Sequence, residues 1–237
     1  MISLICCTNN LKTYEEMLLK SLKMQNIEYE IVLIDNKDNK YKSASSALNA
    51  GARLSHGDYL VFAHQDITFN DPNFLRNIIK YIDELDGIVG VAGSLNENGV
   101  ITNLRQGPHN DLGGVLTLSE PTKVQTLDEV LIACHKLIYD QIKFDEVTCD
   151  DWHLYGVDFC LSAAGEGIGS YVIPDEIYHK SSGQISMGYA LTLRKVLKKH
   201  RKSYYKIFTT CSVSSTKRLR ATQYVVGLIW DHVIIGR

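Results

Sequence analysis

The sequence predicts an α/β fold in which a mixed, mostly parallel sheet is covered by helices. Short apolar runs, typical of buried strands, occupy residues 2–7, 30–36 and 59–64. Two helix-like segments, 13–24 and 43–54, lie between them. Strands that alternate with helices favour parallel pairing. The chain has 237 residues, 45% of them hydrophobic, which is enough to bury one large core or two modest ones.

Two helix starts carry local signals. Thr13 and Glu16 have the spacing of a capping box, which predicts that the first helix begins at Thr13. Asp71 and Pro72 predict a further helix, with Asp71 as its cap, Pro72 in its first turn and its end near residue 85.

The second half of the chain is less regular. Residues 87–94 predict a fourth strand, and 95–123 are rich in Asn, Gly and Pro, which indicates a long functional loop. Further elements are expected in this order: a strand at 131–138, a loop at 144–146, a helix at 152–164, a strand at 170–173 and a loop ending at 180.

The charge is divided unevenly. Residues 1–179 hold 13 basic and 26 acidic residues, a net charge of −13, whereas residues 180–237 hold 12 basic residues and one acid, a net charge of +11. An amphipathic helix is expected in this basic tail, with its apolar face at Leu193, Val196, Leu197, His200, Tyr204, Ile207 and Phe208. The tail could pack on the acidic body, contact an anionic membrane surface or recognise a phosphate-bearing polymer. Nucleic acid is not an expected partner, because the body is acidic and no reader motif is present.

The remaining composition predicts a cytoplasmic protein, with the inner face of the membrane as the site of any attachment. No secretory signal pattern follows Met1, and the six cysteines form no CxxC pairs. No apolar run reaches the ~18 residues of a membrane span; the nearest, 224–235, is interrupted by Asp231 and His232.

The triplet His64-Gln65-Asp66 directly follows a strand that reads as buried on both faces. Ligands bind at the carboxyl ends of strands in open α/β sheets. A carboxylate there, with a histidine two residues before it, suits a divalent cation that holds a phosphate. The alternative is an ordinary turn in which Asp66 is a cap.

Taken in order, several motifs over residues 2–183 resemble family-2-type glycosyltransferases of the GT-A fold. The matching segments are Cys7-Thr8-Asn9-Asn10, Val32-Leu33-Ile34-Asp35-Asn36, Leu48-Asn49-Ala50-Gly51-Ala52, Gly57-Asp58-Tyr59-Leu60-Val61-Phe62, His64-Gln65-Asp66, Phe144-Asp145-Glu146 and residues 152–160. His64 replaces the first acid of the family's DxD, and Tyr155-Gly156 replaces its paired Glu-Asp. A subgroup with H-Q-D is the closer likeness. We expect a GT-A domain at 1–183 and a basic helical extension at 184–237.

This resemblance implies a set of donor and metal residues. Those expected at the nucleotide sugar are Thr8, Asn9, Asp35, Asn36, Asn49, His64 and Gln65. Asp35 and the Thr8-Asn9 loop could instead be turn and capping residues. Asp66 and His179 are the expected ligands of a divalent cation, Mn²⁺ or Mg²⁺, and Mn²⁺ tolerates a mixed oxygen and imidazole shell better.

The transfer also needs a general base for the acceptor hydroxyl. The candidates are Asp158, which aligns with the motif acid, Asp151 on the same predicted helical face, and His153. Asp151 could be only the helix cap. Asp128 resembles an acid on the acceptor side. One base without a second carboxylate nucleophile favours inversion at the anomeric carbon.

The predicted function is therefore metal-dependent transfer of a hexosyl group from a nucleoside-diphosphate sugar, UDP-type favoured, to a saccharide, lipid-linked or polymer acceptor, as in polysaccharide biosynthesis. One alternative is a sugar nucleotidyltransferase, although the loop at 8–11 lacks the glycines that such chemistry favours. The other is a nucleotide-sugar-binding protein that has lost catalysis.

Overall fold

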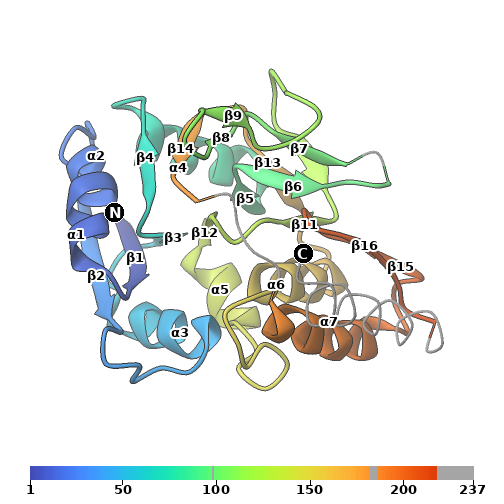
Figure 1. The fold of residues 1–237 in the computed structure, drawn as a ribbon. Coiled ribbons are helices and arrows are strands. Elements are labelled where there is room, and N and C mark those ends of the chain that lie inside the picture. Colours follow the sequence, from blue (N-terminus) through green and yellow to red (C-terminus); the bar gives the residue numbers. More distant parts are fainter. Residues whose placement is uncertain (98, 182–185, 218–237) are drawn as a thin grey trace.

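A computed structural model describes residues 1–97, 99–181 and 186–217. Its centre is a seven-stranded sheet in the order β10-β13-β5-β12-β3-β1-β2 (Figure 1). The strands are β1 (Ile2–Thr8), β2 (Tyr29–Asp35), β3 (Tyr59–Ala63), β5 (Ile88–Gly90), β10 (Thr122–Val124), β12 (Leu131–His135) and β13 (Ser170–Val172).

Five of these strands run in the same direction. β1 pairs in parallel with β2 and with β3, and β13 pairs in parallel with β5. β12 lies between β3 and β5 and is antiparallel to both, while β10 is antiparallel to β13. The predicted mixed, mostly parallel sheet is confirmed.

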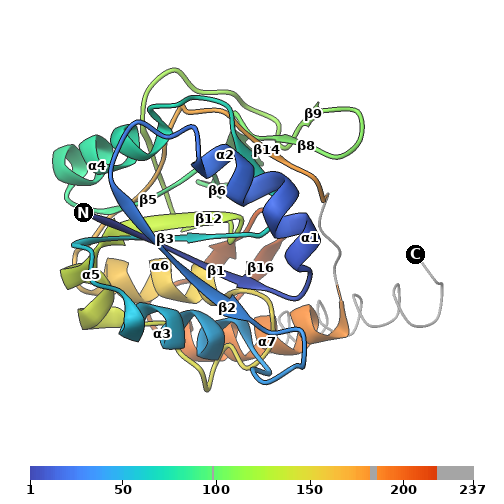
Figure 2. The same cartoon turned by 90° about the vertical axis from the view of Figure 1, so that its left-hand side faces the viewer.

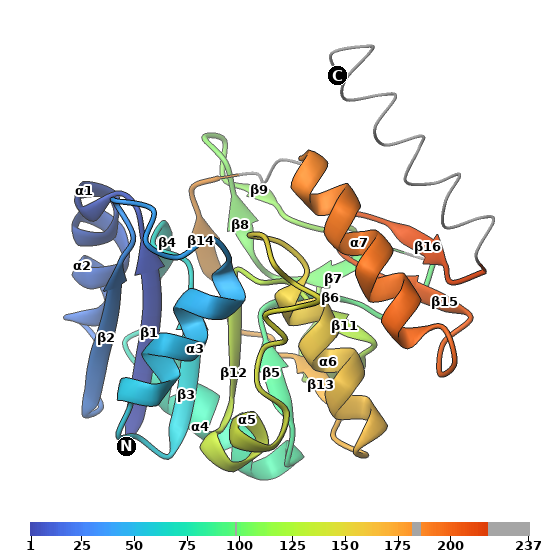
Figure 3. The ribbon, with the colours of Figure 1, turned by 90° about the horizontal axis from the view of Figure 1, so that it is seen from below.

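Helices cover both faces of this sheet (Figure 2). On one face lie α3 (Ala44–Leu54), α5 (Lys136–Ile142), α6 (Tyr155–Gly165) and α7 (Met187–His200), of which α6 and α7 are neighbours (Figure 3). One buried cluster joins all four helices to the sheet, through side chains such as Leu48, Phe62, Tyr139, Phe159 and Leu193. The amphipathic helix of the tail therefore packs in the same core as the helices before residue 183.

The opposite face is covered by α4 (Phe74–Leu85) and by one helical segment near the N-terminus. That segment consists of α1 (Leu11–Tyr14), a π-helical turn η1 (Glu15–Leu19) and α2 (Lys20–Leu22). Its side chains at 14, 18 and 22 share a second buried cluster with Phe74 and Ile78 of α4. Because side chains alternate along a strand, β1 supplies Ile5 to one cluster and Leu4 and Cys6 to the other.

Three small sheets complete the fold. The first contains β6 (Ala92–Ser94), β7 (Val100–Thr102) and β11 (Thr126–Leu127), and the last is the hairpin of β15 (Lys206–Phe208) and β16 (Val213–Ser215). The remaining one has the order β4-β14-β8-β9, from β4 (Ile67–Phe69), β14 (Ile177–His179), β8 (Arg105–Gln106) and β9 (Asp111–Leu112).

Two helix starts differ from the prediction. The capping-box interpretation of Thr13 is wrong, since the cap is Asn10, whose Oδ1 accepts from the Thr13 N–H at 3.1 Å. α4 begins at Phe74 rather than after Asp71, because Asp71 forms a turn of its own and accepts from the Asn73 N–H at 2.8 Å. A short-range side-chain contact decides each start.

Several predicted strands also have different limits. The segment 87–94 divides at Val91 into β5 and β6, which belong to different sheets. The strand predicted at 131–138 ends at His135, whose ring nitrogen accepts from the Leu137 N–H and starts α5. The loop at 95–123 contains β7, β8, β9 and the start of β10, and the loop ending at 180 contains β14.

The tail turns earlier than its periodicity predicts. α7 ends at His200, and Ile207 and Phe208 lie in β15 instead of on the helix. Its cations contact acids of the body: Lys195 pairs with Asp150, Lys199 with Asp145 and Asp158, and Lys206 with Glu97. These lysines of the tail therefore pack on the acidic body, as one of the three interpretations expected. Contact of the tail with a membrane stays a prediction. The apolar run at 224–235 lies outside the described residues.

Within the three described stretches of the chain, no helix has the length and apolar character that a membrane span requires.

Close packing of α3 on β1 gives a stability prediction. A Cβ at Gly51 would lie 2.5 Å from Ile5 Cγ2 in the core, so Gly51→Ala should lower the free energy of unfolding by about 1–3 kcal/mol despite the better helix propensity of alanine. Gly165→Ala in α6 is the control, because nothing lies within 4 Å of its Cβ position. Urea denaturation of both variants measures the difference, and equal stability would contradict this account of the packing.

Candidate active site

Three side chains meet beyond the carboxyl end of β3. His64 and Asp66 lie in the turn between β3 and β4, and His179 ends β14. β14 pairs antiparallel with β4, with His179 opposite Ile67, and the Lys180 N–H donates to the Asp66 carbonyl at 3.0 Å. Backbone pairing therefore brings a histidine from late in the chain to the turn after the central strand.

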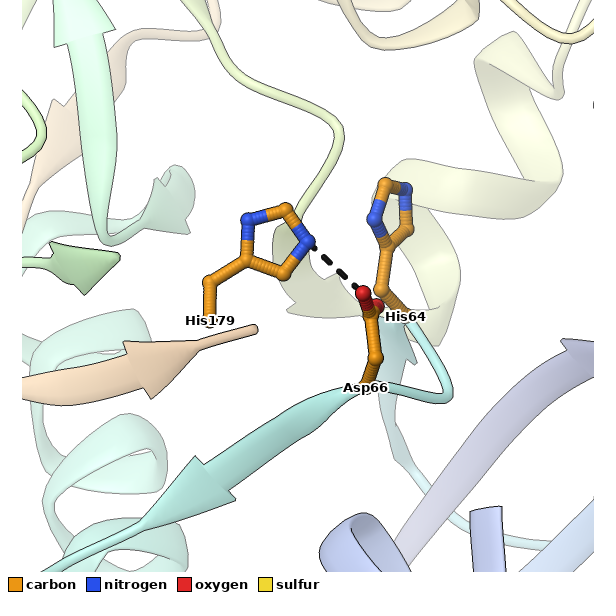
Figure 4. A group of neighbouring side chains, drawn as sticks. All are labelled: His64, Asp66 and His179. Atoms are coloured by element: carbon orange, nitrogen blue, oxygen red, sulfur yellow. Dashed lines mark ion pairs between the residues drawn. The ribbon is translucent and has the colours of Figure 1, made fainter. Parts of the chain in front are cut away.

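These side chains point toward one another (Figure 4). His179 Nε2 lies 3.3 Å from Asp66 Oδ1, the rings of His64 and His179 have centroids 5.5 Å apart, and one donor atom of each residue lies within 4.8 Å of the others. His179 is buried, and its Nε2 has only this ion-pair contact with Asp66, which lacks the geometry of a hydrogen bond within the described part of the chain. A ligand that completes the bonding of a buried imidazole nitrogen is therefore favourable.

The electrostatics favour the protonation states that bind metals. Burial lowers the pKa of His64, and the neighbouring His179 lowers it further, against the opposing effect of Asp66 and Asp128. Burial acts to raise the pKa of Asp66, but its contacts with His179 and His64 outweigh this and leave that pKa below its ordinary value. Two imidazoles and one carboxylate fit a transition-metal cation such as Mn²⁺ better than Mg²⁺, which prefers oxygen ligands.

A cavity of about 320 Å³ lies next to this cluster, and His64 and Asp66 form part of its wall. Its apolar floor includes Ala44 and Leu48 of α3. The other lining side chains that matter for chemistry are Asn9, Asn36, Asn39, Gln65, Trp152 and Tyr155. A lining that combines amide groups with aromatic rings suits a polar ligand with a ring.

Of the predicted donor residues, Asn9, Asn36, His64 and Gln65 line the cavity. The Thr8 hydroxyl is buried and donates to Gln65 Oε1, while Gln65 Nε2 donates to Asn9 Oδ1 at 3.0 Å. The Asn10 N–H also donates to Gln65 Oε1, at 3.2 Å. Thr8 therefore positions Gln65 rather than facing the cavity.

The pair Asp35-Asn36 divides between two roles. Asp35 is exposed, accepts from the Lys37 N–H at 2.9 Å in a turn, and does not line the cavity. Asn36 is buried and lines it, while its side chain bonds to both the N–H and the carbonyl of Tyr41. These bonds fix the loop that carries Asn39, whose φ of 52° is left-handed.

Asn49 lies apart from the cavity. Its amide is buried and donates to the Phe144 carbonyl at 2.9 Å and to Glu146 Oε1 at 2.8 Å, and its oxygen accepts from Tyr139. The structure therefore gives Asn49 the task of holding the 144–146 loop against α3, a correction to its expected contact with the donor.

The three candidate bases lie in different surroundings. Asp158 is 2% exposed and pairs with Lys199 Nζ at 2.7 Å and His200 Nε2 at 2.8 Å, so it joins α6 to α7 and does not line the cavity. Asp151 precedes α6, which begins only at Tyr155, so the two acids do not share a helical face. His153 lies close enough to His64 to affect its pKa, and its Nε2 is 3.1 Å from Ser186 Oγ.

Asp128 lies on the His64 side of the site and interacts with that ring electrostatically. Its two oxygens accept from the Val130 N–H at 3.0 Å and from Thr210 Oγ1 at 2.5 Å. The sequence reasoning missed the aromatic lining residues Trp152 and Tyr155 as binding residues, although both stand in the matched motif at 152–160.

A family model described as "Glycosyltransferase like family" matches residues 3–206. The chain belongs to this family. The match confirms the superfamily expected from the motifs and supports a transferase, while the H-Q-D subgroup stays a prediction.

Solved structures show the same fold at low identity. S. aureus TarS 1–349 in complex with UDP-GlcNAc has a TM-score of 0.61 and 14% identity, covering 98% of this chain and 72% of that one. Mannosyltransferase PcManGT from Pyrobaculum calidifontis, in complex with GDP-Man and Mn²⁺, has a TM-score of 0.59 and 13% identity, with coverage of 98% and 70%. GalNAc-T7 with UDP, GalNAc and Mn²⁺ has a TM-score of 0.61 and 12% identity, with coverage of 83% and 48%. The comparison with curated proteins gives no match.

The cluster predicts selective metal binding. Mn²⁺ at about 100 times its dissociation constant should stabilise the wild-type protein by about 2.7 kcal/mol. Asp66→Asn removes the anionic ligand and should weaken binding at least tenfold, which lowers this gain by about 1.4 kcal/mol. Mn²⁺ affinity should fall at acid pH, where the His64 ring becomes protonated, and because burial lowers the pKa of His64 this loss should begin at a lower pH than for an ordinary histidine.

Thermal unfolding with and without Mn²⁺ measures this effect. Asp35→Asn is the matched control, because it removes the same charge from an exposed turn outside the cluster. Equal Mn²⁺ stabilisation of Asp66→Asn and wild type would exclude this cluster as the metal site.

A second prediction concerns Asp158. Asp158→Ala leaves Lys199 and the buried His200 without their common partner, so the free energy of unfolding should fall by about 3 kcal/mol. Asp150→Ala removes an exposed pair with Lys195 and should cost about 0.5 kcal/mol. Chemical denaturation compares the two, and an Asp158→Ala variant as stable as Asp150→Ala would contradict the structural role.

Proposed function

We propose that this protein transfers a hexosyl group from a nucleoside-diphosphate sugar, with UDP-type donors favoured, to a saccharide, lipid-linked or polymer acceptor. The observation that carries the proposal is the His64-Asp66-His179 cluster beside a cavity that His64 and Asp66 line, in a chain of the glycosyltransferase-like family. Structural neighbours that hold UDP-GlcNAc, or GDP-Man with Mn²⁺, support a donor of this class.

The cluster would hold a divalent cation, with Mn²⁺ preferred, through His64, Asp66 and His179. When bound, the cation supplies Lewis-acid stabilisation of the charge that develops on the departing diphosphate. The Asn9 and Gln65 amides, fixed by Thr8, bind and orient the nucleotide. Trp152 and Tyr155 provide the aromatic wall against which a sugar or base ring packs.

A single displacement would invert the anomeric carbon. The donor sugar would lie between the diphosphate site and the side of the cavity formed by Tyr155, with the acceptor hydroxyl attacking from the opposite direction to the leaving group. Asp158 is paired with Lys199 and His200 of α7, so the proton acceptor belongs to the groups near His64, among which are His153 and Asp128.

The test combines binding with turnover. UDP-GlcNAc, UDP-glucose and GDP-mannose are screened by thermal shift with and without Mn²⁺, and nucleoside diphosphate release is then measured for each donor that binds. We expect at least one donor to raise the melting temperature only with Mn²⁺ and to be hydrolysed slowly, with release reduced at least 100-fold in Asp66→Asn. The anomeric configuration of the released sugar, read by NMR at early times, should be opposite to that of the donor.

The alternatives give different results. Pyrophosphate release from a nucleoside triphosphate and a sugar phosphate would indicate a nucleotidyltransferase. Binding of a donor with no hydrolysis would indicate a protein that has lost catalysis, and retention of configuration would exclude the single displacement.

A further inference from the structure

The segment 128–130 contains two acidic residues, Asp128 and Glu129, beside the His64-Asp66-His179 cluster. It precedes β12, which pairs antiparallel with β3, so that Leu131 lies opposite Ala63. The pairing continues one residue further, where the His64 N–H donates a hydrogen bond to the Val130 carbonyl at 3.1 Å. Asp128 and Glu129 are therefore positioned at the same sheet edge as His64, by backbone bonds rather than by a flexible loop.

Glu129 differs from the other acids near the site. Both oxygens of Asp128 have hydrogen-bond donors, and Asp158 is paired with Lys199 and with the ring of His200. Glu129 Oε1 is fully buried and has no hydrogen-bond partner among the described residues. A buried carboxylate oxygen left without a donor is rare in structural sites.

Gly156 lies directly beside this side chain. A Cβ at Gly156 would lie 2.5 Å from Ile132 Cδ1, 3.2 Å from Glu129 Cγ and 3.5 Å from Glu129 Oε1, so a side chain here would meet Ile132 first and Glu129 next. The backbone N–H groups of Gly156 and Val157, in the first turn of α6, face the same carboxyl group. Glu129 thus occupies the space that an acidic side chain at position 156 would use, where this chain has Tyr155-Gly156.

The backbone of Glu129 is bonded to a wall residue of the cavity. Tyr155 lines the cavity, and its hydroxyl donates to the main-chain carbonyl of Glu129 at 3.2 Å. Glu129 as a whole is half-buried. The residue is therefore one contact removed from the cavity, between Tyr155 and the strand end that carries His64.

The surroundings also suit proton transfer. Burial raises the pKa of Glu129 to about 8, with a further contribution from Asp128, while the N–H groups of Val157 and Gly156 oppose the rise. The titratable groups that face it are Asp128, Cys149, Tyr155, Cys160, Tyr189 and Cys211, and none of these six is a cation. A base with a pKa near the working pH is the most effective kind.

We infer that Glu129 is the general base of the transfer, supplied from the loop before β12 in place of an acid on α6. The inference rests on the proposed function. In the step, the Glu129 carboxylate takes the proton of the acceptor hydroxyl, whose oxygen forms the new bond to the anomeric carbon. The bond from that carbon to the diphosphate oxygen breaks, and its electron pair leaves with the diphosphate.

The test is Glu129→Gln, which keeps the shape of the side chain and an oxygen that can face the α6 N–H groups. The probe is hydrolysis of UDP-GlcNAc with Mn²⁺, or of GDP-mannose if only that donor binds, with water in the place of the acceptor. We expect kcat to fall about 100-fold or more, while the donor dissociation constant and the Mn²⁺ thermal shift change less than twofold. Glu146→Gln is the matched control, since Glu146 bonds to Asn49 away from the cavity, and it should keep kcat within twofold.

The pH profile separates catalysis from a structural role. The base acts when deprotonated, so wild-type kcat should rise with pH and level off above about 8. In Glu129→Gln, the residual kcat should no longer rise with pH. Loss of the contact between this side chain and the N–H groups of α6 would not by itself remove the pH dependence. Glu129→Gln with kcat within threefold of wild type, or with the same pH limb, would overturn the inference and leave the proposed function intact. A wild-type protein that neither binds nor hydrolyses any of the donors would overturn the proposed function, and this inference with it.

Discussion

The pairing of β4 with β14 is the constraint on which the site depends. Asp66 lies immediately before β4, and His179 is the last residue of β14, so their approach follows from three antiparallel residue pairs. This pairing spans more than a hundred residues of sequence, and it places a buried imidazole against a carboxylate that would otherwise face the end of the central sheet. Without it, the turn after β3 would hold only two donor groups, too few to hold a cation firmly.

The sequence predicts much of the sheet and little of the smaller strands. The buried strands at the start of the chain and the helices α3 and α4 have strong periodicity or clear breakers, and tertiary contacts do not change them. β8, β9 and β14 are two or three residues long, and such strands exist only because neighbours pair with them. The segment 95–123, predicted as a functional loop, therefore contains the strand β8, which pairs with β14, the strand of His179.

The same distinction applies within the site. His64 and Asp66 could be proposed from the sequence because they follow the apolar run of β3 and carry metal-binding side chains, and His179 because the family resemblance implies it. The surroundings of Asp158 could not, since its partners Lys199 and His200 come from a helix whose docking is a tertiary event. The place of Glu129 likewise depends on Gly156 and on the antiparallel insertion of β12, and no short-range pattern encodes either. Asn49 matched a motif of the family, yet its amide group donates its hydrogen bonds to the 144–146 loop.

One segment belongs to two sheets at once. β5 and β6 are separated only by the buried Val91, and β5 pairs in the central sheet while β6 pairs with β7 and β11. Strand side chains alternate with a period of two. Adding or deleting a single residue here would therefore move the buried side chains of either β5 or β6 to the opposite face of its sheet. Among related proteins, length variation should thus be excluded from this short stretch and concentrated in the connections that precede and follow it.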